Sequence, residues 1–439
     1  MPSKLRKLAV GLILTLVLVC LIMPKVIGLF VGNFINDDAL AMLPPEMRAL
    51  LSVQDISYAS GWFRSEAELT LEYAPLDAYE GLALPTTLHI QHGPLLVTRD
   101  GLTLGLAYAD IEPHSDNADL QSLLADIPFA LPTTRITLLT SFTGAVQLRV
   151  AVDGIDYTTP GAALLLDGLH LSFTARPDLS THSQLRVNQL QAQAEDSGFN
   201  VSLIGLVSEG HTRRHAPALA TGDMQLLLEH FSSTSPLPIV LEDLRSDSSL
   251  HDDTDATLRF NQHLSIPSID SELPLSAIEL DLDIGDLQLA ALQRFSTLAA
   301  DVQASANANP GVLTPVMTEA LGEAALLLLN NPLTLNLALR ADAYGGDHAV
   351  DLALRWSGLP NLTEIARLDL REALAALMIT LDLSLDLEAA ARSSLAPSID
   401  PYVQQGYLQL DNGRIILQAR LENLTIRLND QTLTADELL

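Results

Sequence analysis

After a long apolar start, the chain alternates apolar and polar residues in many short stretches. In one of them Ala67, Leu69 and Leu71 are separated by Glu68 and Thr70. Side chains of a β-strand point alternately to its two faces, so this pattern predicts a strand with one wet face.

Further alternating stretches follow, separated by turn residues such as Asp153-Gly154. They cover 86–91, 95–98, 102–109, 135–141, 145–152, 163–173, 184–192, 199–206 and 224–229. Short strands divided in this way favour antiparallel meanders. Residues 53–235 are therefore predicted to be a β-rich first part.

Residues 232–256 are rich in serine and aspartate, and we predict a loop or linker over 236–276. An acidic cluster lies there, formed by Asp243, Asp247, Asp252, Asp253 and Asp255 with His251. Carboxylate oxygens bind calcium, but this stretch lacks the glycine and the closing glutamate of a calcium loop. A solvated acidic loop is the favoured interpretation.

Residues 277–439 mix the periods of strand and helix. Helices are predicted over 289–302, 316–329 and 369–378, and strands over 278–284, 333–339, 350–356, 379–387, 407–410, 414–421 and 424–428, with turns at Gly345-Gly346 and Asn412-Gly413. Helices do not regularly separate the strands, which indicates an α+β class. We expect a β-rich, largely antiparallel, elongated domain with a few amphipathic helices in this second part. Its leucine-rich strand faces must be covered by helices, by a second sheet or by a bound apolar ligand.

The apolar start predicts a transmembrane anchor within residues 1–32, followed by a spacer over 33–52. Leu8–Met23 has no charge but rises only about 24 Å as a helix, less than the roughly 30 Å hydrocarbon core. Leu8–Val31 rises about 36 Å, which is enough with some tilt. Lys25 would then extend to the outer interface.

Flanking charge sets the expected orientation. Lys4, Arg6 and Lys7 precede the apolar run, and Asp37-Asp38 follows it. The positive-inside rule places the N-terminus in the cytoplasm and the bulk of the chain across the membrane.

Two other interpretations of the start stay open. A cleaved signal peptide could use Ala39-Leu40-Ala41, although this lies far beyond the apolar run. A lipoprotein signal would need a small residue before Cys20, where Val19 stands instead.

Charge excludes one class of partner. The formal net charge is −30, and no lysine follows Lys25. Such a surface repels nucleic acid and anionic headgroups, so no nucleic-acid role is expected. A salt-rich surrounding and the base composition of the genome are both possible origins of the acidity.

We find no catalytic, cofactor or metal motif. His89 and His92 are three apart in a predicted strand and so lie on opposite faces. Cys20, the single cysteine, lies in the apolar run. The sequence therefore predicts no catalytic residue, no metal and no cofactor.

One cluster stands apart as a possible contact site. Tyr58, Trp62, Phe63 and Arg64 lie close together where the first strand region begins. Aromatic and arginine side chains are enriched at interaction hot spots, so these four are candidates for contact with a partner or ligand. Ordinary packing at the entry of a strand is the alternative.

Several of these features resemble the YdgA-like family of bacterial proteins, which carry a domain of unknown function. The resemblance rests on the basic N-terminus with its apolar helix, residues 58–67 (YASGWFRSEA), His92-Gly93-Pro94-Leu95, Gln405-Gly406-Tyr407-Leu408 and residues 424–429 (LTIRLN). Asp430 stands where the family has a glycine. The resemblance implies an inner-membrane protein with a periplasmic domain and no established reaction.

We expect a non-enzymatic, single-pass envelope protein whose periplasmic β-rich domain binds a partner protein or an amphipathic or lipid ligand. One alternative is an envelope hydrolase with an unrecognised carboxylate pair. Another is structural assembly through the edge of the sheet.

Overall fold

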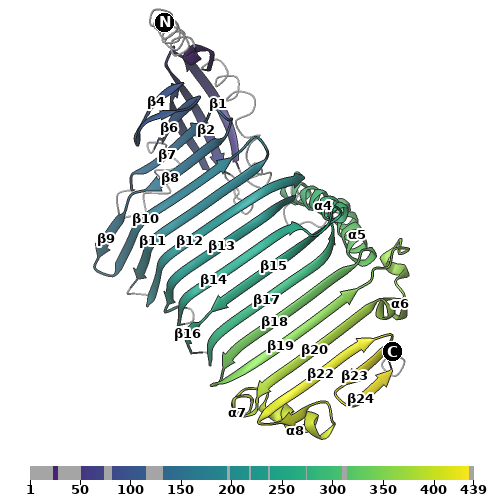
Figure 1. Cartoon of the computed structure of the whole chain (residues 1–439). Coiled ribbons are helices and arrows are strands. Elements are labelled where there is room, and N and C mark those ends of the chain that lie inside the picture. Colours follow the sequence, from purple (N-terminus) through teal and green to yellow (C-terminus); the bar gives the residue numbers. More distant parts are fainter. Residues whose placement is uncertain are drawn as a thin grey trace, which may run out of the picture. The chain divides into compact units, whose positions relative to one another are not determined.

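The computed structural model describes residues 23–27, 51–73, 82–114, 132–194, 198–216, 219–235, 238–272, 274–308 and 314–434 (Figure 1). The chain divides into two compact units. Unit 1 comprises Met1–Tyr157 and Asp167–Arg186, and unit 2 comprises Thr158–Leu166 and Val187–Leu439.

Unit 1 is built on an antiparallel sheet. Its strands are β1 (Leu51–Ser60), β2 (Arg64–Tyr73), β3 (Leu82–His92), β6 (Ala107–Pro113), β7 (Thr134–Thr140), β8 (Val146–Val152) and the end of β10 (Ala162–Ala175), paired in that order. A separate hairpin, β4 (Leu95–Thr98) and β5 (Gly101–Leu104), is inserted between β3 and β6. The division between the units falls within β9 (Ile155–Thr159), β10 and β11 (Ser180–Ala194).

The alternation predicted for β2 is confirmed. Ala67 and Leu69 are buried, whereas their neighbours Glu66 and Glu68 are exposed. The strand forms because this register places Ala67 and Leu69 on the core face and Glu66 and Glu68 in solvent.

A short helical segment, residues 23–27, packs on the core of unit 1. Ile27 is 6 % exposed and lies in one cluster with Ala67, Ile90, Ala107 and Ala109. The prediction that residues 23–27 lie in the membrane is wrong for the part described, because this burial is against protein.

Lys25 lies on the surface of unit 1, and its position at a membrane interface stays a prediction. Its Nζ donates hydrogen bonds to Ser60 Oγ at 3.0 Å and to the Gly61 carbonyl at 3.4 Å. Among the described residues no helix is long and apolar enough to cross a membrane. The rest of the predicted anchor, 8–22 and 28–31, lies outside them.

Unit 2 is also antiparallel, and its strands pair with strands one or two places away in chain order. Its strands are β12 (Phe199–Ala216), β13 (Leu219–Ser233), β14 (Ile239–Asp252), β15 (Thr257–Ile266), β16 (Ser268–Ser271), β17 (Leu275–Gln288), β18 (Leu333–Ala343), β19 (Gly346–Trp356), β20 (Leu377–Asp386), β21 (Gln409–Asp411), β22 (Arg414–Glu422), β23 (Thr425–Leu428) and β24 (Gln431–Thr434). β15 and β16 pair with the same strand, β14, and are separated by Pro267, which has no N–H for the ladder. The α+β class with a largely antiparallel sheet is thus confirmed.

The predicted linker over 236–276 is wrong. This segment contains β14, β15 and β16, with a turn at 253–256 between the first two. The serine- and aspartate-rich part pairs with β13 on one side and β15 on the other. Ladder hydrogen bonds overcome the low strand propensity of aspartate here, because one face of the strand is solvated.

Six helices accompany the described part of unit 2. They are α4 (Leu289–Ala308), α5 (Pro315–Asn330), the 3₁₀ turn η1 (Ile365–Arg367), α6 (Leu370–Ala375), α7 (Leu387–Ala390) and α8 (Ala396–Gln404). The predictions of α4 and α5 are confirmed. The helix predicted over 369–378 is shorter, because Leu377 already begins β20.

Two tight turns set the register of the later strands. Asn412-Gly413 turns as predicted, with positive φ at both residues. The other turn lies at Tyr344-Gly345, one residue before its predicted place, because Ala343 pairs with Gly346. Two central residues with positive φ match the right-handed twist of the flanking strands.

We predict that His92 makes unit 1 less stable in acid. Burial lowers the pKa of His92, and Lys25 acts in the same direction. The carbonyls of Trp62 and Pro24 oppose the lowering without reaching hydrogen-bonding geometry. Because the unfolded chain takes up a proton below about pH 6.5, stability should fall as the pH drops from there toward the lowered pKa.

His92→Leu should remove this acid sensitivity and change stability at neutral pH by less than about 1 kcal/mol, because both ring nitrogens lack a hydrogen-bond partner. The measurement is the thermal midpoint at about pH 7.5 and about pH 5.5, followed by Trp62 fluorescence in a Trp356→Phe background. His89→Leu is the control, since His89 is exposed. An unchanged acid response in His92→Leu would contradict the assignment.

A second prediction concerns Gly222 in β13. Its φ is +151°, and a Cβ there would overlap the carbonyl oxygen of His211 on β12. Gly222→Ala should destabilise unit 2 by about 3 kcal/mol, from strain plus displacement of β12. Gly413→Ala, with φ +79° and no atom within 4 Å, should cost only about 1 kcal/mol. Equal shifts of the urea midpoint for the two variants would show that the close approach is unimportant.

Candidate functional site

The strands of unit 2 give its sheet two chemically different faces. In β17, Leu280, Leu282 and Ile284 point to one face, while Asp281 and Asp283 point to the other. Residues directly paired across antiparallel strands share a face, so the register carries this division across the sheet.

The apolar side chains form three rows across β17, β18, β19, β20 and β22. The rows are Leu280–Leu339–Val350–Leu383–Leu417, Leu282–Leu337–Leu352–Leu381 and Ile284–Leu335–Leu354–Ile379–Leu421. We call this set the leucine face. Every member keeps partial solvent exposure, whereas a covered core would bury most of them almost completely.

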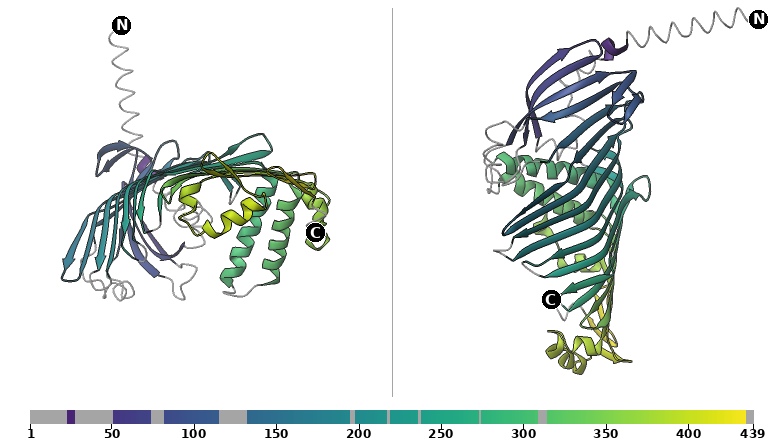
Figure 2. Two further views of the ribbon diagram at one scale, coloured as in Figure 1. Left: turned by 90° about the horizontal axis from the view of Figure 1, so that it is seen from below. Right: turned by 90° about the vertical axis from the view of Figure 1, so that its left-hand side faces the viewer.

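The helices lie on the side of the leucine face but cover only the ends of its strands. Figure 2 shows α4, α5, α7 and α8 on the same side of the unit 2 sheet. At one end Ile399 of α8 and Ala390 of α7 pack on Ile415, which is 1 % exposed. At the other end Trp356 Nε1 donates to the Leu329 carbonyl of α5 at 3.0 Å. These helix contacts lie at the two ends of the strands and do not include the side chains in the middle of the leucine face.

The α4–α5 pair is held together mainly by its own contacts. Leu298 of α4 and Ala320 of α5 are each 5 % exposed. Arg294 donates to both oxygens of Glu323, at 2.6 and 2.8 Å, and this holds the pKa of Glu323 below its usual value. The two helices therefore stabilise each other through their own contacts at one end of the strands.

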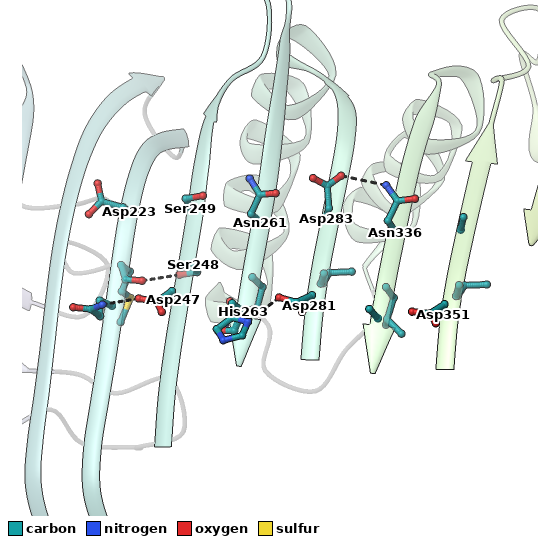
Figure 3. Close-up of a pocket in the computed structure, with 18 of the residues that line it drawn as sticks. Asp223, Asp247, Ser248, Ser249, Asn261, His263, Asp281, Asp283, Asn336 and Asp351 are labelled. Atoms are coloured by element: carbon teal, nitrogen blue, oxygen red, sulfur yellow. Dashed lines mark hydrogen bonds and ion pairs between the residues drawn. The ribbon is translucent and has the colours of Figure 1, made fainter. Parts of the chain in front are cut away.

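The opposite face of the sheet is acidic. Figure 3 shows side chains from successive strands projecting together, with helices behind the sheet. They form a depression of about 760 Å³. Its acidic and histidine side chains, which we call the acidic face, are Glu209, His211, Asp223, Asp247, His263, Asp281, Asp283, Asp351 and Asp382.

Hydrogen bonds between strands organise the acidic face. Asp247 accepts from Gln225 at 2.7 Å and from Arg245 Nε at 2.5 Å, and the bond from Arg245 lowers the pKa of Asp247. A carboxyl group held ionised accepts hydrogen bonds but cannot act as a general acid. Asp247 therefore does not supply the proton donor that the alternative hydrolase needs.

Three residues of this face could in principle hold a metal ion. His263, Glu279 and Asp281 have ligand atoms within 4.8 Å of one another. His263 Nδ1 and Asp281 Oδ1 already share a hydrogen bond of 2.7 Å, and both acidic groups are exposed. Sequence spacing could not reveal this cluster, because the pairing of β15 with β17 brings it together.

The predicted contact residues separate into two environments. Trp62 and Phe63 are 54 % and 50 % exposed in the β1–β2 turn, and Arg64 beside them is exposed. Tyr58 instead packs against the unit 1 core, and its hydroxyl donates to Ser65 Oγ at 2.9 Å. Contact with a partner through these residues stays a prediction.

His89 and His92 lie on opposite sides, as predicted. His89 is exposed, 3.8 Å from Glu112, and His92 is buried. The acidic residues for which a solvated loop was favoured do not form a loop: Asp243 and Asp247 lie within β14, and only Asp253 and Asp255 lie in the turn after it.

Comparison with known proteins gives a family and no function. A family model described as a bacterial protein of unknown function (DUF945) matches residues 3–436. No curated protein and no solved structure gives a significant match. The match agrees with the expected kind of family over nearly the whole chain, while the YdgA-like label stays a prediction. The chain thus belongs to the bacterial DUF945 family.

Proposed function

We propose that this chain is a non-enzymatic, single-pass envelope protein whose leucine face binds the acyl chains of an amphipathic lipid. The observation that carries the proposal is the partial exposure of every residue in the three apolar rows. Contiguous exposed apolar surface is unfavourable in water and marks binding sites in soluble domains.

The chemistry of the leucine face favours a lipid over a protein partner. Its rows contain only leucine, isoleucine and valine, and the backbone N–H and C=O groups of these strands are used in ladder pairing. Protein hot spots are rich in tryptophan, tyrosine and arginine and poor in leucine. A smooth aliphatic surface without free polar groups suits a flexible hydrocarbon chain.

The dimensions of the leucine face also fit an acyl chain. At about 4.8 Å between strands, the two rows that cross five strands are about 19 Å long and the row that crosses four is about 14 Å long. The acyl chains of one leaflet fill about half of a hydrocarbon core of roughly 30 Å. A chain lying along a row would therefore contact several strands at once.

Membrane attachment is part of the same proposal. Residues 8–22 are uncharged, and Lys4, Arg6 and Lys7 precede them. A helix over these residues would rise about 22 Å, short of a typical core but tolerated where the bilayer thins locally. By the positive-inside rule the N-terminus would lie in the cytoplasm and both units in the periplasm.

Charges on the leucine face should abolish lipid binding. Leu337→Asp with Leu352→Asp places two carboxylates at one cross-strand pair of the face. Native mass spectrometry of the detergent-extracted full chain should then show retained lipid reduced by about tenfold or more, since each buried charge is strongly unfavourable.

The matched control adds the same charges one residue further along the same strands. Ala338→Asp with Ala353→Asp points to the acidic face and should leave retained lipid nearly unchanged. A photoreactive fatty acid should label peptides of β18 to β22 in the unmodified chain. The absence of both retained lipid and labelling there would refute lipid binding by this face.

A further inference from the structure

Unit 1 exposes large apolar side chains at one end of its sheet. They are Trp62, Phe63, Leu95, Val97, Leu102 and Leu104, each between 50 % and 71 % exposed. We call this set the unit 1 apolar patch. Four of its members come from the β4–β5 hairpin, whose strands were predicted but whose side chains were not among the predicted contact residues.

The hairpin presents one wholly aliphatic face to solvent. Leu95 pairs with Leu104, and Val97 pairs with Leu102, so all four side chains share a face. Leu96 on the other face is fully buried and fixes the hairpin against the rest of unit 1. A single register thus buries Leu96 and leaves four aliphatic side chains uncovered.

The β1–β2 turn lies beside the start of this hairpin. The Phe63 carbonyl accepts a hydrogen bond of 2.8 Å from the N–H of His92, where β3 ends. Arg64 is paired with Gln91, and Gln91 Oε1 in turn accepts from the N–H of Val97 at 3.1 Å. The aromatic and aliphatic members therefore belong to the same end of one sheet.

The charged residues of the hairpin turn are paired within unit 1. Arg99 Nε lies 3.1 Å from Asp110 Oδ1, and Arg149 donates to Asp100 at 2.9 Å. Neutralised charges of this kind lower the cost of bringing the surrounding apolar residues to a membrane interface.

Residues 23–27, which follow the uncharged stretch of the proposed anchor, pack at this same end of unit 1. Lys25 bonds to Ser60 and Gly61, the residues directly before Trp62. Because residues 23–27 pack on unit 1, an anchor over 8–22 would leave the bilayer within a few residues of this end. An anchor of only about 22 Å also holds whatever follows it close to the headgroups.

We propose that the unit 1 apolar patch inserts into the outer leaflet of the membrane that holds the anchor. Tryptophan is enriched at the membrane–water boundary, and aliphatic side chains beside it reach about 5–10 Å into the headgroup and acyl boundary. The patch is thus a second, non-covalent membrane contact. It rests on the proposed anchor but not on lipid binding by the leucine face.

Trp62 is a natural probe for this insertion. The chain has two tryptophans, so Trp356→Phe leaves Trp62 alone. The full-length variant is placed in nanodiscs of phosphatidylcholine and phosphatidylglycerol with or without brominated acyl chains. Brominated lipid should reduce Trp62 fluorescence by about twofold or more, because bromine quenches only indoles that it can contact.

Equal Trp62 intensity in the two lipids overturns the proposal. If crosslinks between Trp62 turns of separate chains accompany that result, a second copy of this chain covers the patch instead. The converse variant, Trp62→Phe, leaves Trp356 beside the leucine face and reports on acyl chains bound there. Quenching of Trp62 therefore tests insertion of the patch, and quenching of Trp356 separately tests lipid binding by the leucine face. Co-elution of the protein with nanodiscs tests the anchor.

Charged substitutions give an independent arm. Leu102→Asp with Leu104→Asp in the Trp356→Phe background should return Trp62 fluorescence to its unbrominated level while the anchor keeps the protein in nanodiscs. The control, Thr133→Asp with Thr134→Asp, adds the same charge to exposed residues at the opposite end of the strands and should leave quenching unchanged. If brominated lipid still quenches Trp62 fluorescence in the Leu102→Asp with Leu104→Asp variant, the β4–β5 hairpin does not contribute to membrane insertion.

Discussion

The structure depends on one constraint, the antiparallel pairing of strands that follow one another in the chain. Each pairing fixes a register, and a register fixes which side chains share a face. A slip of one residue in β18 would move Leu335, Leu337 and Leu339 from the leucine face to the acidic face. The short turns at Tyr344-Gly345 and Asn412-Gly413 prevent such a slip by fixing the first paired residues.

The two faces of unit 2 differ in how well their side chains are satisfied. On the acidic face, carboxylates meet solvent and cross-strand donors, as Asp351 does with Arg340 at 2.7 Å. On the leucine face, α7 and α8 cover one end of the strands and α5 the other, and the rows between keep partial exposure. The backbone polar groups of these paired strands thus have hydrogen-bond partners, whereas the apolar side chains of the leucine face remain partly exposed to water. A bound acyl chain would remove this apolar surface from water.

Unit 1 shows the same imbalance on a smaller scale. Its core is filled by small residues such as Ala67 and Ala109, against which Ile27 packs. The β4–β5 hairpin buries Leu96 alone and exposes its other aliphatic side chains. This apolar surface lies beside residues 23–27 and is the one that we propose to insert into the membrane.

The sequence by itself determined many of the strands, the α4 and α5 helices and the apolar–acidic alternation, because a period of two or of 3.6 residues is present in the local residue order. It did not predict β14, since the aspartates and serines there form a strand only through pairing with β13 and β15. It also identified Trp62 and Phe63 but missed Leu102 and Leu104, whose exposure depends on which face of the hairpin packs inward. Only the tertiary structure decided which leucines remain uncovered, because burial depends on what lies across from a face, and no local pattern encodes that.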